Sequence, residues 1–159
     1  MKKLLFLVPV IFLVCSCKSK TALDFSEKIV QKEKSLGDDI KNTESRVKDF
    51  ILAGKFDSMA VVSTKMEGLI NEKLNEIKGM QTPDLKFADD FKRHAMEYFA
   101  YMKKIYTGYV KYAKAETDEL RQKEYENIQD MVSQKDNVLR TMRDSQNKFA
   151  KANGFKLKG

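Results

Sequence analysis

Residues 87–112, FADDFKRHAMEYFAYMKKIYTGYVKY, carry the clearest structural signal in this chain. Large or apolar side chains recur every three or four positions through the whole stretch, which is the period of one face of an α-helix. This face comprises Phe87, Phe91, Ala95, Tyr98, Met102, Ile105, Tyr109 and Tyr112. We therefore expect a helix that starts at Asp84, after the turn at residues 81–83, and packs this face into a core.

Two further helices are expected on the N-terminal side. The first begins at Asp24, with Glu27 at the capping-box spacing, and ends at Gly54. The second is capped by Asp57 and ends near Gly79. Their expected core positions are Phe25, Ile29, Leu36, Ile40, Val47 and Ile51 in the first helix, and Met59, Val62, Met66, Leu69, Lys73 and Ile77 in the second.

A fourth helix is expected on the C-terminal side. Thr117 is its predicted N-cap, and Asp118 and Glu119 in the first turn suit the positive end of a helix. Its expected core positions are Leu120, Ile128, Met131, Val138, Met142 and Phe149. The pair at 153–154, Asn-Gly, closes the helix, and Phe155 is placed to fold back on the last turn.

The four helices together predict an all-α fold. No strand-like alternation of useful length is present, and charged residues make up 33% of the chain. Connections of two to five residues force neighbouring helices to run antiparallel, so residues 24–159 are predicted to form an up-down-up-down four-helix bundle. Helices of about 30 residues would make this bundle roughly 45 Å long.

The first residues have a different character. Met1, Lys2 and Lys3 form a short basic head, and Leu4 to Val14 is an apolar run. This is the layout of a secretory signal peptide, and the run is too short for a membrane-spanning helix, which needs roughly 20 apolar residues. We therefore expect residues 1–16 to direct export and then to be removed.

Both cysteines of the chain, Cys15 and Cys17, directly follow this run. Val14-Cys15-Ser16-Cys17 has an apolar residue three before Cys17 and a small residue directly before it, and so resembles the lipobox of bacterial lipoproteins. The resemblance implies that Cys17 receives a diacylglycerol with acyl chains such as palmitate, that the chain is cut before it, and that residues 17–23 form a lipidated tether. Two alternatives are an ordinary cut after Ser16, giving a freely secreted protein, and a redox or metal pair, for which one intervening residue is awkward.

A second resemblance concerns the C-terminal end. The run from Ser145 to Leu157, behind a helical body and a lipobox, is similar to small surface-lipoprotein families of unassigned function in Gram-negative bacteria. Lys18-Ser19-Lys20 carries no acidic residue, and among such lipoproteins this implies the outer membrane with the domain facing the periplasm, while surface exposure stays open. The resemblance carries over no functional residue except Cys17.

The charge distribution predicts one basic end. The net charge of +7 falls to +5 without Lys2 and Lys3. In an up-down-up-down bundle the start of the first helix and the end of the fourth share a pole, and the cations expected there are Lys18, Lys20, Lys148, Lys151, Lys156 and Lys158. This pole could face anionic head groups, or its C-terminal cations could simply complement the helix dipole.

Residues for catalysis are scarce. His94 is the chain's single histidine, and it lies three before Glu97, in the reverse order of the Glu-x-x-His pairs of helical di-iron sites. No glycine-rich phosphate loop occurs. We therefore expect no enzyme activity, no cofactor and no metal.

The aromatic residues at 87–112 allow one sharper hypothesis. Tyrosines interleaved with lysines can stack nucleic-acid bases, but an exported protein rarely meets nucleic acid, and none is expected as a partner. The simpler interpretation is that these aromatic side chains form one face of the helix and pack into the core. Alternatively, Tyr98, Tyr109 and Tyr112 line an apolar pocket with hydroxyl groups for a small ligand. The sequence thus predicts a lipid-anchored envelope protein acting as a structural or protein-interaction module, with ligand binding through this tyrosine-rich helix as the alternative.

Overall fold

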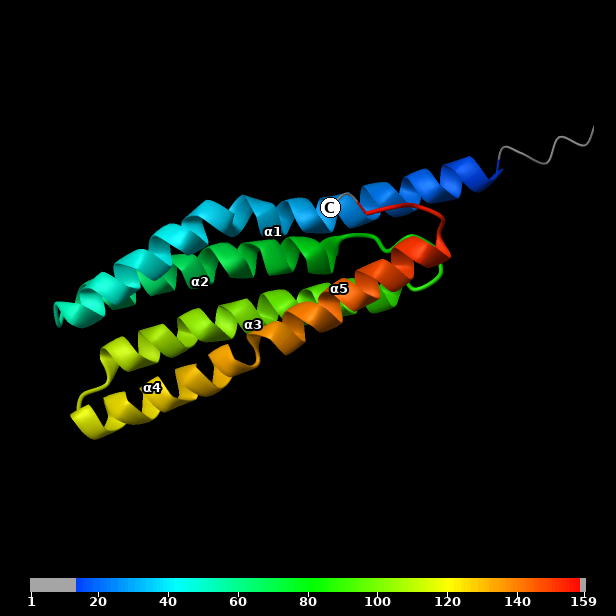
Figure 1. Cartoon of the computed structure of the whole chain (residues 1–159). Helices are drawn as coiled ribbons and strands as arrows, with labels where there is room; N and C mark the ends of the chain where they lie inside the picture. Colours follow the sequence, from blue (N-terminus) through cyan, green and yellow to red (C-terminus); the bar gives the residue numbers. More distant parts are fainter. Residues whose placement is uncertain (1–13, 158–159) are drawn as a thin grey trace, which may run out of the picture.

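The chain is all-helical over the residues that the structure describes. A computed structural model, which describes residues 14–157, contains five helices and, within that range, no strand (Figure 1). They are α1 (Val14–Leu52), α2 (Phe56–Gly79), α3 (Ala88–Lys114), α4 (Asp118–Ser133) and α5 (Lys135–Ala152). The predicted all-α class is confirmed for this part of the chain.

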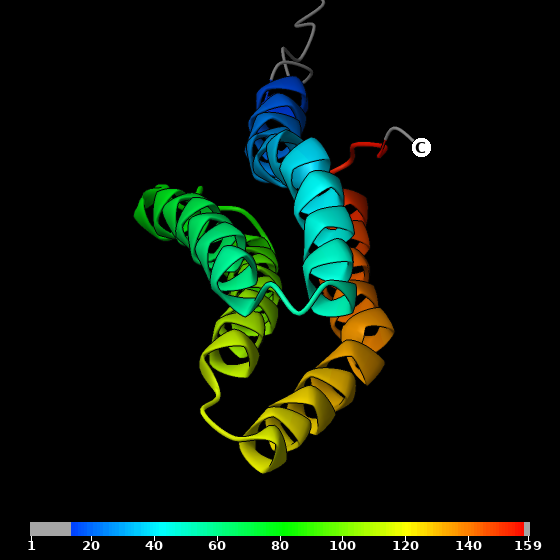
Figure 2. The same ribbon diagram turned by 90° about the vertical axis from the view of Figure 1, so that its left-hand side faces the viewer.

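The helices form a bundle in which α3 makes the most extensive contacts. It contacts α2, α4 and α5, whereas α1 packs on α2 and α5. Figure 1 shows the ribbon running back and forth along one long axis. Figures 1 and 2 both show the end of α1 and the start of α4 lying apart, and we call the end of the bundle where α1 stops the open end.

Two helix ends follow the prediction. Gly54 adopts a left-handed φ of +65°, and the Lys55 amide donates to the Phe50 carbonyl at 2.8 Å, which is the bond of a Schellman ending. Gly154 repeats this with a φ of +72°, and the Phe155 amide donates to the Ala150 carbonyl at 3.2 Å. The Phe155 ring also packs on Phe149, as expected.

Several predicted helix starts were wrong. α1 begins at Val14 rather than Asp24, and fully buried Ala22 belongs to the core. Lys55, not Asp57, occupies the N-cap of α2 and makes no side-chain cap bond. α3 begins at Ala88 instead of Asp84, because Phe87 takes a left-handed conformation with a φ of 65° and sits at the N-cap. Thr117 does cap α4, accepting from the Leu120 amide at 3.2 Å.

The predicted fourth helix is divided at Gln134 into α4 and α5. The Ser133 hydroxyl donates to the Asp130 carbonyl at 2.7 Å, which is the carbonyl that the Gln134 amide would use in a continuous helix. The Gln134 amide bonds to the Met131 carbonyl instead, at 3.0 Å. That carbonyl also accepts from the Tyr101 hydroxyl at 2.8 Å. Side-chain hydroxyls thus occupy the backbone acceptors at the break.

The core has two parts. The larger contains a group of aromatic rings from three helices, Phe25, Phe91 and Phe149, with centroids 5.6–6.2 Å apart. The smaller, Val47, Met59, Val62 and Ala113, lies toward the open end. Two predicted core positions differ: Leu120 is 50% exposed, and Lys73 is half-buried because its ammonium group pairs with Glu76 at 2.7 Å.

Candidate functional site

Four tyrosine hydroxyls of α3 find partners within the protein. Tyr98 donates to Glu33 at 3.0 Å, and Tyr101 to the Met131 carbonyl. Tyr106 and Tyr109 donate to the two oxygens of Glu44, at 2.8 and 3.2 Å. Burial raises the pKa of Tyr106 and Tyr109 above the ordinary value of 10.0, and the negative charge of Glu44 raises it further. These hydroxyls therefore stay protonated and act as donors.

The predicted site residues separate into two places. Tyr98 lies buried against Glu33, and burial followed by the Glu33 charge raises its hydroxyl pKa. Tyr109 and Tyr112 lie further along α3 and share the lining of one pocket, which Tyr98 does not reach. The structure thus brings together two of the three predicted tyrosines.

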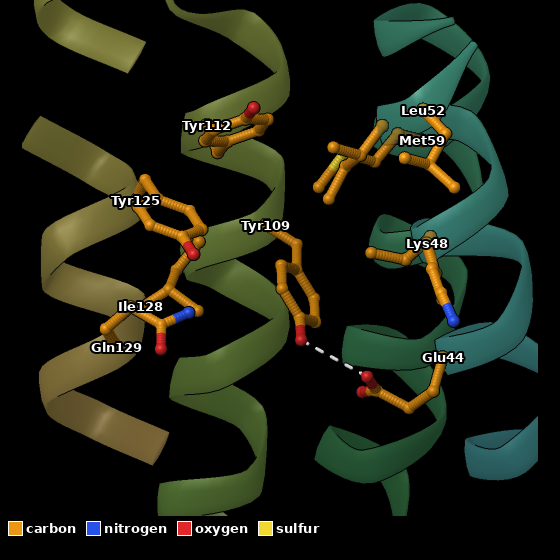
Figure 3. Close-up of a pocket in the computed structure, with 11 residues that line it drawn as sticks. Glu44, Lys48, Leu52, Met59, Tyr109, Tyr112, Tyr125, Ile128 and Gln129 are labelled. Carbon is orange, nitrogen blue, oxygen red and sulfur yellow. Dashed lines mark hydrogen bonds between the residues drawn. The ribbon is translucent and has the colours of Figure 1, made fainter. Parts of the chain in front are cut away.

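This pocket is a cleft at the open end of the bundle, which we call the distal cleft (Figure 3). It has a volume of about 210 Å³. All of its lining comes from four helices: Glu44, Val47, Lys48, Ile51 and Leu52 of α1, Met59 of α2, Tyr109 and Tyr112 of α3, and Tyr125, Ile128 and Gln129 of α4. Aromatic rings from α3 and α4 face aliphatic side chains of α1 and α2 across the cleft.

Contacts at the start of α4 hold the aromatic side of the distal cleft in place. The Tyr112 ring meets Phe56 edge-on at 5.8 Å and lies 6.5 Å from Tyr125. The Arg121 guanidinium covers the Phe56 ring at 4.3 Å and donates to the Ala115 carbonyl at 2.7 Å. The start of α4 is therefore tied to both α2 and α3, while its side toward α1 is open.

Two residues of the distal cleft were missed by the sequence reasoning. Glu44 falls four after Ile40 and three before Val47. The sequence therefore places its carboxylate on the apolar face of the first predicted helix, where a charged group is unusual. Tyr125 falls three before Ile128, so the sequence likewise places a side chain with a polar tip on the apolar face of α4. Tyr125 is 44% exposed, and it is one of the few large hydrophobic residues that are exposed in the described part of the chain.

The predicted lipidation site lies at the other end of the molecule. Cys17 is exposed on the first turns of α1, and its carbonyl accepts from the Thr21 hydroxyl at 2.9 Å. Ser19 donates to the Gly154 carbonyl at 3.1 Å, so this end of α1 meets the C-terminal turn after α5. Residues 1–13 of the predicted signal peptide lie outside the described residues.

The predicted basic residues gather around this contact. Lys18, Lys20, Lys151 and Lys156 are exposed close to Ser19 or Gly154 in the chain. Lys148 is exposed too, but its ammonium group lies 4.1 Å above the Phe87 ring. Lys158, the remaining member of the predicted group, falls outside the described residues.

His94 contacts two side chains of its own helix. Its Nδ1 lies 3.0 Å from Glu97, and its Nε2 lies 3.0 Å from the Arg93 guanidinium. Within residues 14–157, no three histidine, cysteine or acidic side chains lie close enough together to hold a metal ion.

None of the helices between residues 14 and 157 combines the length and apolarity needed to cross a membrane. No protein-family model matches the chain, and neither a curated protein nor a solved structure matches it.

Proposed function

We propose that this chain is a lipid-anchored protein of the bacterial cell envelope, whose helical domain acts as a structural or protein-interaction module. The mature chain would begin at Cys17 and form an up-down-up-down four-helix bundle, with α4 and α5 together as the fourth member. The outer membrane, with the domain facing the periplasm, is the proposed location. The partners are membrane lipid, through the covalent anchor, and an envelope protein.

The observation that carries this proposal is the exposed thiol of Cys17 at the end of the lipobox-like sequence. A thiol that is to be acylated has to be accessible. Acyl chains contribute roughly 0.8 kcal/mol per buried methylene, so two or three chains would make attachment effectively permanent. The lysines near Ser19 and Gly154 would then lie next to the lipid surface.

Mass spectrometry of the intact protein tests the anchor. The protein is isolated from bacterial membranes beside a Cys17→Ala variant. We expect a mass that starts at Cys17 with acyl chains added, and a variant that loses this modification. An unmodified mass starting at Cys17, after a cut behind Ser16, would show a freely secreted protein and would end the proposal of a lipid anchor.

The distal cleft favours a second candidate function, the binding of a small ligand. Its walls are mostly apolar, and polar groups of Glu44, Lys48 and Gln129 stand among them. Such a combination is typical of ligand sites, although a volume of about 210 Å³ restricts the ligand to a compact one. The residues involved are Tyr109, Tyr112 and Tyr125 rather than the predicted set with Tyr98.

A further inference from the structure

Glu44 is the most unusual residue of the distal cleft. It is partly buried, and each of its carboxylate oxygens accepts one tyrosine hydroxyl, from Tyr106 and from Tyr109. No ion pair joins it to a lysine, arginine or histidine of the described chain. A charge that is withdrawn from water normally has an opposite charge beside it, so the carboxylate lacks its usual counter-ion.

Three aromatic rings line the same cleft as this carboxylate. Tyr109, Tyr112 and Tyr125 all line the distal cleft, and Tyr109 reaches from the middle of the cleft to Glu44 (Figure 3). The face of an aromatic ring is electron-rich and attracts cations, and rings arranged around one space are the common means of holding alkylated ammonium groups. The carboxylate and the rings therefore both favour a positively charged ligand.

The opposite wall of the distal cleft favours a ligand with an apolar body. Val47, Ile51 and Met59 present aliphatic carbon and sulfur there. The volume of about 210 Å³ exceeds that of the cavities of about 150 Å³ that accept a benzene molecule. There is room for a group of a few carbon atoms, and not for a long chain.

From these contacts we infer that the distal cleft binds a compact organic cation, an alkylated ammonium group with an apolar body. Glu44 is its counter-ion, and the rings of Tyr109, Tyr112 and Tyr125 contact its alkyl groups. This inference rests on the second candidate function, ligand binding in the distal cleft, and is independent of the lipid anchor.

Lys48 is the competing group. It lies one helical turn after Glu44 and lines the same cleft, and its side chain is exposed. An ammonium group there can compete with a bound cation for the carboxylate, because residues four apart on a helix are neighbours. Lys48→Gln is therefore expected to strengthen cation binding, whereas a site for anions would be weakened by the same change.

The inference is tested with three probes of nearly equal shape. Choline carries a trimethylammonium group, 3,3-dimethylbutanol replaces it by a neutral tert-butyl group, and 3,3-dimethylbutyrate adds a negative charge. Binding to the full chain is followed by NMR shifts of backbone amides at Gln129 and Ile51. We expect choline to bind about tenfold more tightly than the neutral alcohol, a difference of about 1.4 kcal/mol, and the carboxylate to bind most weakly.

Matched variants locate the site. Glu44→Gln removes the charge and keeps the shape, and should weaken choline binding about tenfold. Glu33→Gln makes the same change at the carboxylate that accepts from Tyr98, away from the distal cleft, and should leave binding unchanged. Tyr125→Leu should weaken binding several-fold, whereas Tyr125→Phe keeps the ring and should retain it.

The outcomes of these experiments separate a failure of the cation inference from a failure of ligand binding in the distal cleft. If the neutral alcohol binds as tightly as choline and shifts the same amides, the distal cleft is an apolar ligand site and only the inference of a cation fails. If the carboxylate binds best and Lys48→Gln abolishes its binding, the charge preference is the reverse of the one inferred. If no probe shifts Gln129 or Ile51, or if Glu33→Gln acts like Glu44→Gln, ligand binding in this cleft falls together with the inference.

Discussion

At the residue scale, Gly108 allows α4 to lie close against α3. A β-carbon at this position would come within 2.9 Å of the Met131 methyl group and 3.0 Å of Ile128. The Met131 side chain can move aside because the contact is with its flexible end, but Ile128 is the one buried residue of α4. The absence of a side chain at Gly108 thus sets how closely the two helices pack.

We expect Gly108→Val to destabilise the protein by about 1–3 kcal/mol, because its methyl groups overpack the contact with Ile128. Gly68→Ala is the matched control. Gly68 is exposed in α2 and a β-carbon there meets nothing within 4 Å, so the gain in helix propensity should stabilise the protein by up to about 1 kcal/mol. Urea unfolding of both variants measures this, and an unchanged midpoint for Gly108→Val would contradict the close approach.

Part of the candidate site could be predicted at this scale. Tyr109 and Tyr112 stand out from the 87–112 stretch because they continue an apolar helical face with polar tips. The pairing of Tyr109 with Glu44 could not be predicted, since the two residues are 65 apart in the chain. Helical period assigns a residue to a face but does not say which residue of another helix stands opposite. For the same reason Tyr98 was grouped with the other two tyrosines.

At the scale of elements, side-chain hydroxyls occupy backbone carbonyls at the division between α4 and α5. Ser133 takes the Asp130 carbonyl and Tyr101 the Met131 carbonyl. No glycine or proline marks the break in the sequence, so the local sequence predicts one continuous helix. One of these two contacts comes from a residue of another helix, which sequence period cannot reveal.

We expect Ser133→Ala to make α4 and α5 more continuous, because the Asp130 carbonyl becomes free for the Gln134 amide. Hydrogen exchange at Gln134 should slow several-fold. Thr141→Ala is the matched control, since the Thr141 hydroxyl also bonds to a carbonyl, that of Asn137 at 2.9 Å, in the unbroken part of α5. Unchanged exchange at Gln134 would show that the Ser133 hydroxyl does not maintain the break.

Helix ends differ in how well they can be predicted. Gly54 and Gly154 ended their helices as expected, because a left-handed residue is easiest for glycine. The sequence predicts a start for α1 that is too late in the chain, because Asp24 and Glu27 have the spacing of a capping box. Ala22, before this motif, is fully buried, so packing extends the helix beyond its apparent cap.

At the scale of the whole molecule, charge is unevenly distributed along the bundle. Lysines surround the end where Ser19 meets Gly154. The helix at the open end, α4, is acidic: Asp118, Glu119, Glu124, Glu126 and Asp130 outnumber Arg121 and Lys123. A molecule with this distribution orients in the field of an anionic surface with its basic end toward the charge.

We therefore expect the unlipidated Cys17→Ser protein to bind anionic vesicles and to be released by salt. Changing Lys151 and Lys156 to glutamine should weaken binding roughly 25-fold, at about 1 kcal/mol per charge. The same change at Lys111 and Lys114, exposed at the far end of α3, should have little effect. Equal losses in both variants would mean that net charge alone, and not the basic end, determines binding.

The length of α1 has a geometric consequence for the distal cleft. One unbroken helix leads from Cys17 to Ile51, a rise of about 50 Å at 1.5 Å per residue. Because Cys17 lies within α1 and the helix is packed from Ala22 onward, little slack would separate an anchor at Cys17 from the folded domain. With α1 standing upright on the membrane, the distal cleft would lie at a fixed height above the bilayer. A partner from the same membrane would need a stalk of comparable height to reach it.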